Sequence, residues 1–405
     1  MECTLAPAPP AIAAPLPVTP ASLLAAFAAV PDPRRQASVT YALPAVLALA
    51  VTALLANQDS VLAIAEWAGR QGHAVLGPLG LTTGRAPCQS TLQRLFAKLD
   101  GRAVAAALTA YFTPPAAPAA AGPQGVAGDG KAQRGRLPYQ AGGCPVHALT
   151  AFCHAHGVVL AHEPIAPAAA PGEKGEAELS VAPALLARLD WRDRVLTGDA
   201  LLCQRKVCEQ VLAAGGDYLL VVKENQPTLH RDIALLFGPP ADDPSAPLRD
   251  CRAARTVDHG HGRAADTRHL LASTDLAGYS DWPGLAQVFR LERTWRERGR
   301  RKGEVRYGIT SLAPRRADAA DLLALKRGHW GIENRAHYVK DVTFGEDRSP
   351  IHTGAGPTIA ALLRDAALGL LRLAGHQAIA SRRRHYHDRP REAVALVVGT
   401  PSSRA

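Results

Sequence analysis

The order of short apolar runs between residues 125 and 237 constrains the fold more than any other feature of this 405-residue sequence. Three β-type runs come first, separated by small polar or glycine-rich turns: GVAGDGKA, VHALTAFCH and GVVLAHEPIA. A helix, a strand, a helix, a strand and a helix then alternate as far as Phe237. Three strands followed by this alternation predict a mixed α/β sheet with helices packed on its faces.

Helical patterns precede this core. Positions 1–20 are almost wholly Ala, Pro, Thr and Val, which predicts a flexible tail. The apolar spacing in residues 21–111 is helical and no strand pattern interrupts it, which predicts an all-α N-terminal domain. Its last helix is expected to begin at a Ser90 N-cap and to carry Arg94 and Lys98, a layout that suits a helix-turn-helix DNA reader. A packing or dimerising module explains the same pattern.

The remaining boundaries follow from changes in composition. Residues 112–125 are rich in Pro, Ala and Gly and predict an interdomain linker. Ribonuclease-H-like nuclease cores use the order of elements described above, so we expect residues 126–375 to form such a catalytic domain. Within it, β-type runs return at about 238–316 and predict an inserted β-rich subdomain. Residues 376–405 include RRRHYHDRPR and predict a basic C-terminal tail.

Charge and cysteine content limit the functional classes. Lys and Arg outnumber Asp and Glu by 46 to 36, and the net charge of +10 favours a polyanionic partner, although GC-rich coding alone produces many basic proteins. The seven cysteines include no CxxC pair, and no basic segment precedes the first apolar residues, which favours a reduced, cytoplasmic protein. The longest apolar run, residues 42–56, is shorter than the roughly 18 residues that a membrane span needs.

Three acidic residues lie on or directly after elements of the predicted core. Asp129 lies in the first strand run between two glycines that would let a phosphodiester approach the backbone. Asp199 ends the strand RVLTG, and Glu333 lies in the helical run RGHWGIENRAHYVK. Each has an ordinary explanation alone, as a turn residue, a helix cap or a solvent-facing side chain. Brought together, three carboxylates suit two Mg²⁺ ions that support in-line phosphoryl transfer.

Several motifs occur in one fixed order from about Ser22 to Arg391. GDGKAQRGR carries the first Asp, TGDALLCQRKVCEQVL and DYLLVVKENQPTL surround the second, and RGHWGIENRAHYVKDVTFGED carries the Glu. VPDPRR and IAEWAGR lie in the helical region, and HGRAADTR and WPGL lie in the β-rich insertion. Together they resemble the bacterial insertion-sequence transposases of the DDE type, in the H-repeat-associated branch. An ordered set of motifs is far more specific than any single one.

The resemblance implies an enzyme that nicks DNA at insertion-sequence ends and joins the freed 3′-OH to target DNA. It implies Mg²⁺ as the cofactor, with Mn²⁺ as a substitute, and double-stranded DNA as the partner of a homodimer that is not membrane-bound. It places the metal triad at Asp129, Asp199 and Glu333. It also places a catalytic lysine at Lys340, seven residues after Glu333 and therefore on the same face of a helix.

The other candidate residues are polar or basic and would contact DNA. The KENQ run follows a strand and opens a helix, where backbone N–H groups favour phosphate. The basic turn RTWRERGRRKGEVR surrounds an aromatic ring that could stack on an unpaired base. A histidine and Lys326 stand where the superfamily has an Arg and a Tyr. The expected DNA contacts are Lys131, Lys223, Asn225, Gln226, His261, Arg263, Trp295, Arg300, Arg301, His329 and Asn334.

Two other functions fit the same sequence. A catalytically silent DNA-binding relative, such as a repressor or a domesticated remnant, would keep the fold, and the intact set of three acids argues against it. A structure-specific nuclease on the same core would cut DNA without joining it, and a β insertion suited to handling DNA ends argues against that function. An unliganded polar helix entry explains the KENQ run equally well, and for any single residue of the glycine-rich and basic turns a solvated hairpin tip is the favoured explanation.

Overall fold

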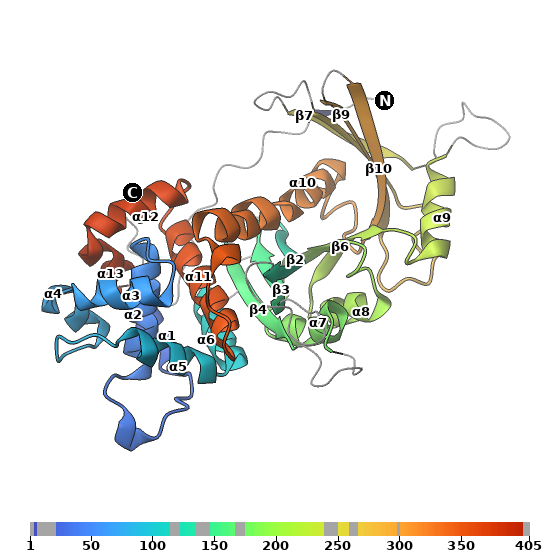
Figure 1. Cartoon of the computed structure of the whole chain (residues 1–405). Helices are drawn as coiled ribbons and strands as arrows, with labels where there is room; N and C mark the ends of the chain where they lie inside the picture. The colour runs from blue at the N-terminus through green and yellow to red at the C-terminus, as the bar shows by residue number, and fades with distance from the viewer. Residues whose placement is uncertain are drawn as a thin grey trace. The chain divides into compact units, whose positions relative to one another are not determined.

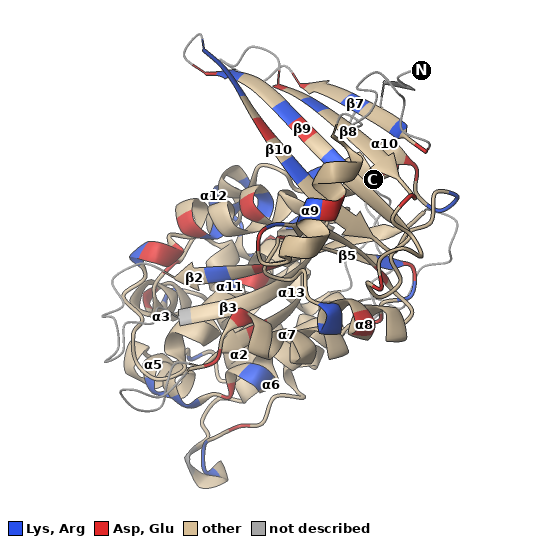
Figure 2. Cartoon of the chain, turned by 90° about the vertical axis from the view of Figure 1, so that its right-hand side faces the viewer, with Lys and Arg blue, Asp and Glu red and all other residues tan. Residues whose placement is uncertain are grey.

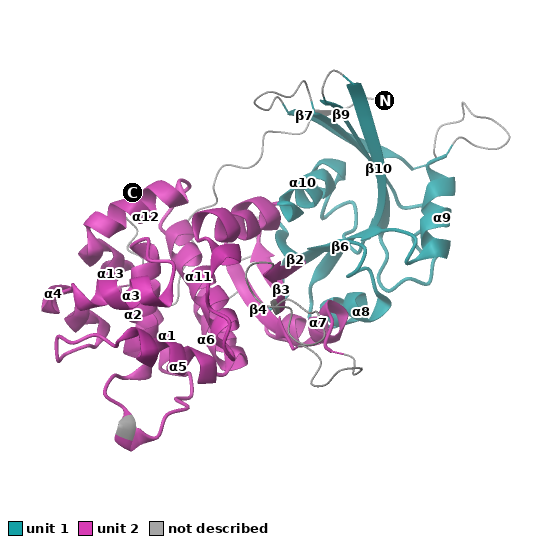
Figure 3. Ribbon diagram, viewed as in Figure 1, with its two compact units in different colours: residues 1–13, 116–128, 190–330 teal, residues 14–115, 129–189, 331–405 magenta. Residues whose placement is uncertain are grey.

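The structure is a computed structural model that describes residues 4–5, 22–113, 122–133, 146–166, 175–238, 250–258, 266–297 and 300–399. The chain divides into two compact units (Figure 3). Unit 1 comprises residues 1–13, 116–128 and 190–330, and unit 2 comprises residues 14–115, 129–189 and 331–405. Strand β2 (Gln124–Gln133) contributes its first half to unit 1 and its second half, beginning at Asp129, to unit 2.

Three parallel strands begin the sheet of unit 1 (Figure 1): the first half of β2, β5 (Arg194–Gly198) and β6 (Asp217–Val222). Helix α8 (Arg205–Ala213) connects β5 to β6, and α9 (Pro227–Leu236) follows β6. Every residue of β5 and β6 is buried, as expected for parallel strands covered by other elements on both faces. The strand and helix order predicted for this stretch is confirmed.

The β-rich segment after α9 continues the same sheet. Strand β10 (Arg300–Thr310) pairs antiparallel with β6, so that Thr310 lies opposite Leu219. Antiparallel pairing then continues outward through β9 (Gln287–Glu297), β8 (Asp266–Ser273) and β7 (Arg252–Asp258), and β1 (Thr4–Leu5) pairs parallel with β7. The segment expected to be an inserted subdomain therefore extends the sheet that β5 and β6 begin, and unit 1 has a mixed sheet.

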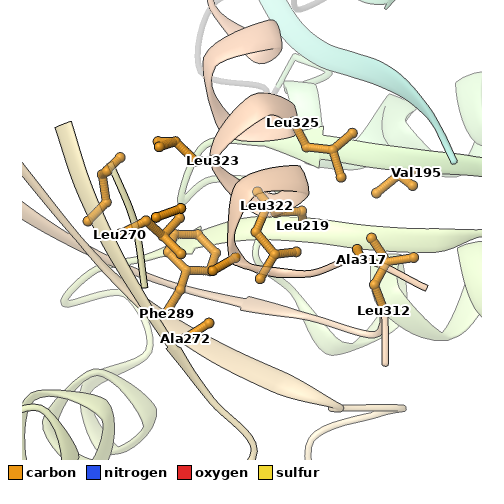
Figure 4. Packing of buried hydrophobic residues seen from close by; sticks show 13 residues of the cluster. Val195, Leu219, Leu270, Ala272, Phe289, Leu312, Ala317, Leu322, Leu323 and Leu325 are labelled. Atoms are coloured by element: carbon orange, nitrogen blue, oxygen red, sulfur yellow. The ribbon is translucent and has the colours of Figure 1, made fainter. Parts of the chain in front are cut away.

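Helix α10 (Ala319–His329) covers this sheet in unit 1. Its capping box, in which Asp318 accepts hydrogen bonds from the backbone of Ala320 and Asp321, fixes where the helix begins. Leucines on its inner face pack against apolar residues from the parallel and the antiparallel strands (Figure 4). The cluster includes Val195, Leu219, Leu270, Phe289, Leu312, Leu322, Leu323 and Leu325. One core thus holds both parts of the sheet.

Unit 2 is mostly helical. Its N-terminal helices are α1 (Leu23–Phe27), α2 (Leu43–Leu55), α3 (Val61–Gly69), α4 (His73–Leu76), α5 (Gln89–Lys98) and α6 (Gly101–Phe112), with short 3-10 turns at Gln36–Ser38 and Gly77–Leu79. Its other elements are the antiparallel pair β3 (Val146–Cys153) and β4 (Val159–Ile165) and the helices α7 (Glu178–Ala187), α11 (Gly356–Leu373), α12 (Ile379–Asp388) and α13 (Pro390–Val398).

The N-terminal helices share their core with the end of the chain. Helix α11 packs against α2, α5 and α6, and α13 packs against α2. Helix α6 also packs against β4. The segment expected as a basic tail is therefore folded: Arg383 of α12 is fully buried, donates to the carbonyl of Leu54 at 2.9 Å and pairs with Asp59. The all-α region is part of a larger unit and not a separate body on a linker.

Serine side chains stand near the starts of two N-terminal helices. Ser60 caps α3, with its hydroxyl accepting from the backbone N–H of Ala63. The predicted Ser90 cap is wrong, because α5 begins at Gln89 with Cys88 as its N-cap. The Cys88 Sγ lies 3.3 Å from the Ser90 hydroxyl, which places that hydroxyl inside the first turn. Apart from Thr4–Leu5, the predicted tail lies outside the described residues, as does most of the predicted linker.

Within the described part of the chain, no helix combines the length and apolar character required to cross a membrane.

Candidate active site

Glu333 lies on a π-helical turn. Helix α10 ends at His329, and two π turns follow it, η4 (Glu333–His337) and η5 (Val339–Thr343). The sequence predicted one continuous helix through Lys340, so the structure corrects the geometry while keeping a helical path. Such turns widen the helix by one residue and occur often at functional sites. The Glu333 side chain is about half exposed, at 52%.

Three side chains of unit 2 gather around this turn. Asp129, Glu333 and His337 each offer a ligand atom, and these atoms lie within 4.8 Å of one another. The Nδ1 atom of His337 lies 3.6 Å from the Oε2 atom of Glu333 and 3.8 Å from the Oδ2 atom of Asp129. Two carboxylates and an imidazole are a donor set that fits a divalent cation. The residues present are therefore compatible with the metal that the family resemblance implies.

The charge states of this cluster follow from burial and proximity. His337 is only 4% exposed, and burial lowers its pKa, although Glu333 acts in the opposite direction. The adjacent His337 in turn holds the pKa of Glu333 below its usual range, against the effect of burial. An ionised carboxylate beside a neutral imidazole offers lone pairs from both groups.

The glycines around Asp129 have a packing role that the sequence did not reveal. A Cβ atom on Gly130 would lie 1.9 Å from the Oε1 atom of Glu178, and one on Gly128 would lie 2.8 Å from the Cδ1 atom of Leu202. Both positions are therefore filled by neighbouring side chains within their own units. The predicted reason for these glycines, close approach of a phosphodiester, is wrong for the faces that these side chains occupy.

Lys131 is buried and paired, which contradicts its predicted DNA contact. Its ammonium lies 2.7 Å from the Oδ1 atom and 2.8 Å from the Oδ2 atom of Asp341. The carboxylate of Glu346, in the 3-10 turn η6 (Glu346–Arg348), lies 3.6 Å from the same ammonium. Lys131 is 9% exposed and therefore has little surface to offer to a phosphate.

Lys340 is also buried, at 1% exposure, whereas the Glu333 side chain is about half exposed. Its ammonium lies 2.7 Å from the Oδ1 atom of Asp365 on α11. Burial alone would lower the pKa of Lys340, but Asp365 and Glu346 raise it, so the amine stays charged. The π turns replace the regular α-helical spacing from which a shared face was predicted, so the shared face of Glu333 and Lys340 stays a prediction.

Asp199 belongs to unit 1, where it directly follows β5. Its Oδ1 atom accepts a hydrogen bond from the backbone N–H of Leu201 at 2.9 Å. Two residues of the KENQ run brace the same loop: Asn225 donates to the carbonyl of Ala200 at 2.7 Å, and Gln226 donates to that of Cys203 at 3.0 Å. The amides predicted to bind DNA therefore hold the segment that carries Asp199.

The pairing of β2 with β5 gives Asp129 and Asp199 equivalent positions along their own strands. In unit 1, β2 and β5 are parallel and Ala127 lies opposite Thr197. Asp129 comes two residues after Ala127, and Asp199 comes two residues after Thr197. Each acid therefore follows a paired position of neighbouring parallel strands by the same interval.

The departures from the superfamily pattern lie on α10 in unit 1. The Nδ1 atom of His329 lies 3.2 Å from the Thr197 hydroxyl on β5, two residues before Asp199. Lys326 is 9% exposed, and burial, together with Arg306, lowers its pKa to about 8, while Asp199 acts in the opposite direction. His329 and Lys326, which replace the superfamily Arg and Tyr, therefore both interact with residues at the end of β5.

The residues of the basic hairpin that were predicted to contact DNA differ in their exposure. Arg300 and Arg301 are exposed at the start of β10, and Figure 2 shows bands of Lys and Arg along β9 and β10. Trp295 is half-buried, with the Arg293 guanidinium 4.9 Å from its ring centroid. Its predicted stacking on a base would require that guanidinium to share or leave the ring.

The remaining predicted residues are exposed or outside the described chain. Lys223 and Asn334 are exposed. His261 and Arg263 lie outside the described residues. The sequence prediction missed His337, although a histidine four residues after Glu333 is a neighbour on a helical surface and its spacing was the available signal.

Comparisons with known proteins agree with the motifs. Residues 24–112 match the family described as DDE_Tnp_1-associated, and residues 147–370 match the family described as Transposase DDE domain. "Putative transposase YncI" of Escherichia coli O157:H7 is 28% identical over 87% of this chain and 87% of its own length. "Uncharacterized protein in dhlA 3'region" of Xanthobacter autotrophicus is 30% identical over 70% of this chain and 92% of its own length.

A third relative, "H repeat-associated putative transposase YhhI" of Escherichia coli (strain K12), is 29% identical over 56% of this chain and 58% of its own length. A solved structure, titled "Cryo-EM structure of piggyBac transposase synaptic complex with hairpin DNA (SNHP)", aligns with a TM-score of 0.42 at 9% identity over 95% of this chain and 79% of that chain, a likeness too weak to establish a shared fold. The Transposase DDE domain match alone spans more than half of the residues. The chain therefore belongs to the family of DDE-domain transposases and has H repeat-associated proteins among its relatives.

Proposed function

We propose that this transposase cleaves DNA at the ends of an insertion sequence and joins the freed 3′-OH ends to target DNA, with Mg²⁺ as its cofactor and Mn²⁺ as a substitute. Asp129, Asp199 and Glu333 are the catalytic carboxylates in this proposal. The observation that carries it is the approach of the Asp129 and Glu333 carboxylates to one another in unit 2, beside a buried imidazole.

The register of β2 and β5 supports including Asp199. Parallel strands end at one edge of a sheet, and ligands of open α/β sheets collect at that edge. Because Asp129 and Asp199 follow paired positions by the same interval, we propose that they act together. The proposal also assigns unit 1 and the strands of unit 2 to a ribonuclease-H-like core.

The residues of the cluster would hold the cation and orient the DNA phosphate. A bound divalent cation supplies Lewis-acid stabilisation of the charge that develops during phosphoryl transfer. The buried His337 and the ion pair of Lys131 with Asp341 fix the side chains behind the carboxylates, while Glu333 stays open to a substrate. A site that must admit a large polyanion requires an exposed carboxylate for the substrate and buried side chains that hold the carboxylates in place.

DNA binding is assigned to exposed basic residues. Arg300 and Arg301 are exposed on β10, and Lys223 is exposed beside the loop that carries Asp199. Such residues would neutralise backbone phosphates without reading sequence. Helix α5 keeps Gln93, Arg94 and Lys98 exposed, so it remains the proposed reader of terminal repeats. Because two ends must be joined, we propose that the protein acts as a homodimer on DNA.

The test is cleavage and joining of labelled DNA that carries the inverted repeats bracketing the gene. Asp129→Asn, Asp199→Asn and Glu333→Gln should each abolish Mg²⁺-dependent cleavage and leave DNA binding largely intact. Glu209→Gln is the matched control, because Glu209 is an exposed carboxylate on α8 that belongs neither to the three-residue cluster nor to the loop that carries Asp199. Full cleavage by Glu333→Gln would overturn the assignment. Cleavage without joining by the wild type would indicate a nuclease, and binding without cleavage would indicate a silent DNA-binding relative.

A further inference from the structure

We infer that His337 is a direct ligand of the metal ion, supplying a nitrogen atom between the Asp129 and Glu333 carboxylates. The inference rests on the proposed function, since it assigns a further residue to the same site. It also determines which metals the site prefers, because a nitrogen ligand changes the preference of an otherwise all-oxygen site.

The distances separate coordination from hydrogen bonding. The Nδ1 atom of His337 lies 3.6 and 3.8 Å from the nearest oxygens of Glu333 and Asp129. Hydrogen bonds between nitrogen and oxygen span about 2.7 to 3.2 Å, so both separations are too long. Two ligand atoms about 2.1 Å from one ion lie about 3.0 Å apart at a right angle and about 4.2 Å apart when opposite. The observed separations fall within that range.

His337 is buried, and the atoms nearest to its Nδ1 atom in the cluster are the carboxylate oxygens of Glu333 and Asp129. The side chain is 5% exposed, and its Nε2 atom is buried without a hydrogen-bond partner among the described residues. A buried polar group without a hydrogen-bond partner lowers the free energy of unfolding. A gain in folding stability therefore does not explain why His337 is buried at this place. The contrast with His162 is informative: that buried imidazole in the same unit hydrogen-bonds through its Nδ1 atom to Asp365 at 3.1 Å.

The π turn explains how one segment supplies two ligands. Glu333 is the first and His337 the last residue of η4. Residues four apart on a helical turn are neighbours, and the widened turn lets both side chains project toward Asp129 on β2. A conventional metal site uses the same device when two ligands lie one turn apart on a helix.

Metal preference follows from the donor set. Mg²⁺ and Ca²⁺ favour oxygen ligands. Mn²⁺ also takes carboxylates, but as a softer transition-metal ion it accepts an imidazole nitrogen more readily than Mg²⁺ does. A site with two carboxylates and one imidazole should therefore bind Mn²⁺ more tightly than Mg²⁺. Replacing His337 by Gln should reduce Mn²⁺ affinity about tenfold or more and reduce Mg²⁺ affinity by a smaller factor.

The experiment uses Mn²⁺ bound to the full chain and reads its electron paramagnetic resonance. Pulsed measurements on the wild type should show coupling of Mn²⁺ to one ¹⁴N nucleus, and titration with Mg²⁺ should give the ratio of the two dissociation constants. His337→Gln should lose the ¹⁴N coupling. It should also lower the ratio of the Mg²⁺ dissociation constant to the Mn²⁺ dissociation constant. His162→Gln is the matched control, since it removes a buried imidazole of the same unit and should keep both signals.

The outcomes distinguish this inference from the proposed function. Asp129→Asn and Glu333→Gln should both weaken Mn²⁺ binding, and if neither does, the proposed metal site is wrong. If both weaken binding but the wild type shows no ¹⁴N coupling, His337 is not a ligand and the proposed function still stands. The wild-type spectrum alone decides this point, so the test does not depend on the folding of His337→Gln.

Discussion

The ammonium of Lys131 contacts both carboxylate oxygens of Asp341, at 2.7 and 2.8 Å. Lys131 lies two residues after Asp129 on β2, and Asp341 lies on η5, which follows the turn that carries Glu333. The ion pair therefore joins the two elements that bring the two acids together. Burial raises the pKa of Asp341 above its usual range, although Lys131 acts in the opposite direction.

We predict that Lys131 positions the metal site without touching DNA. Lys131→Met should raise the Mn²⁺ dissociation constant about tenfold, as removal of an outer-shell partner usually does. Lys131→Arg should restore most of the affinity, because a guanidinium can still pair with Asp341. Measurement well below the melting temperature separates positioning from general destabilisation. A Lys131→Met protein with lower melting temperature but wild-type Mn²⁺ affinity would show a purely structural role.

Lys340 is predicted to stabilise the fold through Asp365. Lys340→Met leaves the buried Asp365 charge without its cation, a change that typically costs about 3 to 5 kcal/mol. Urea denaturation should show this loss, and the double variant Lys340→Met/Asp365→Asn should recover part of it. An unchanged free energy of unfolding together with lost DNA cleavage would instead support the catalytic role that the family resemblance implied.

The Asp365 pair also predicts a pH dependence. Burial would raise the pKa of Asp365, but Lys340 and His162 lower it to about 2. Because the folded pKa is depressed, the stabilisation is complete above the unfolded value near 3.8 and disappears as the pH falls toward 2. The stability difference between wild type and Asp365→Asn should therefore shrink by about 2 kcal/mol between pH 5 and pH 2. A difference independent of pH would contradict the assigned pairing.

The basic hairpin gives a prediction about salt dependence. Among the described residues, Arg300 and Arg301 form no ion pair, whereas Lys302 pairs with Glu297. Each phosphate contact adds about 0.9 to the slope of log affinity against log salt. The double variant Arg300→Gln/Arg301→Gln should lose about two phosphate contacts, so the magnitude of the slope should fall by about 1.8. Lys302→Gln should change the slope little. An unchanged slope in the double variant would make this hairpin a solvated surface.

Much of the fold was predictable because it depends on local patterns. Alternating apolar runs predicted the parallel strands β5 and β6 and the helix α8 between them. The sequence did not predict that α1–α6 would share a core with α11–α13, because that packing joins segments more than two hundred residues apart. As a result, a fragment that ends after α6 would expose the apolar surface of α2 that α11 and α13 cover.

The candidate site was partly predictable for the same reason. The order of motifs identified the three acids, and two of them approach one another in unit 2. The π turns were not predictable, because nothing in local spacing distinguishes them from an α-helix, whereas the four-residue spacing of Glu333 and His337 was a signal that the prediction did not use. Lys131 looked like a DNA contact because its partner Asp341 is 210 residues away in the chain.

The central claim is that Asp199 acts in one metal site with Asp129 and Glu333. The most direct measurement is Mn²⁺ affinity of the full chain bound to end DNA, for wild type, Asp199→Asn and the control Glu209→Gln. The account predicts that Asp199→Asn weakens Mn²⁺ binding at least tenfold, as Asp129→Asn and Glu333→Gln should, and that Glu209→Gln does not. Wild-type Mn²⁺ affinity in Asp199→Asn would contradict the three-carboxylate site.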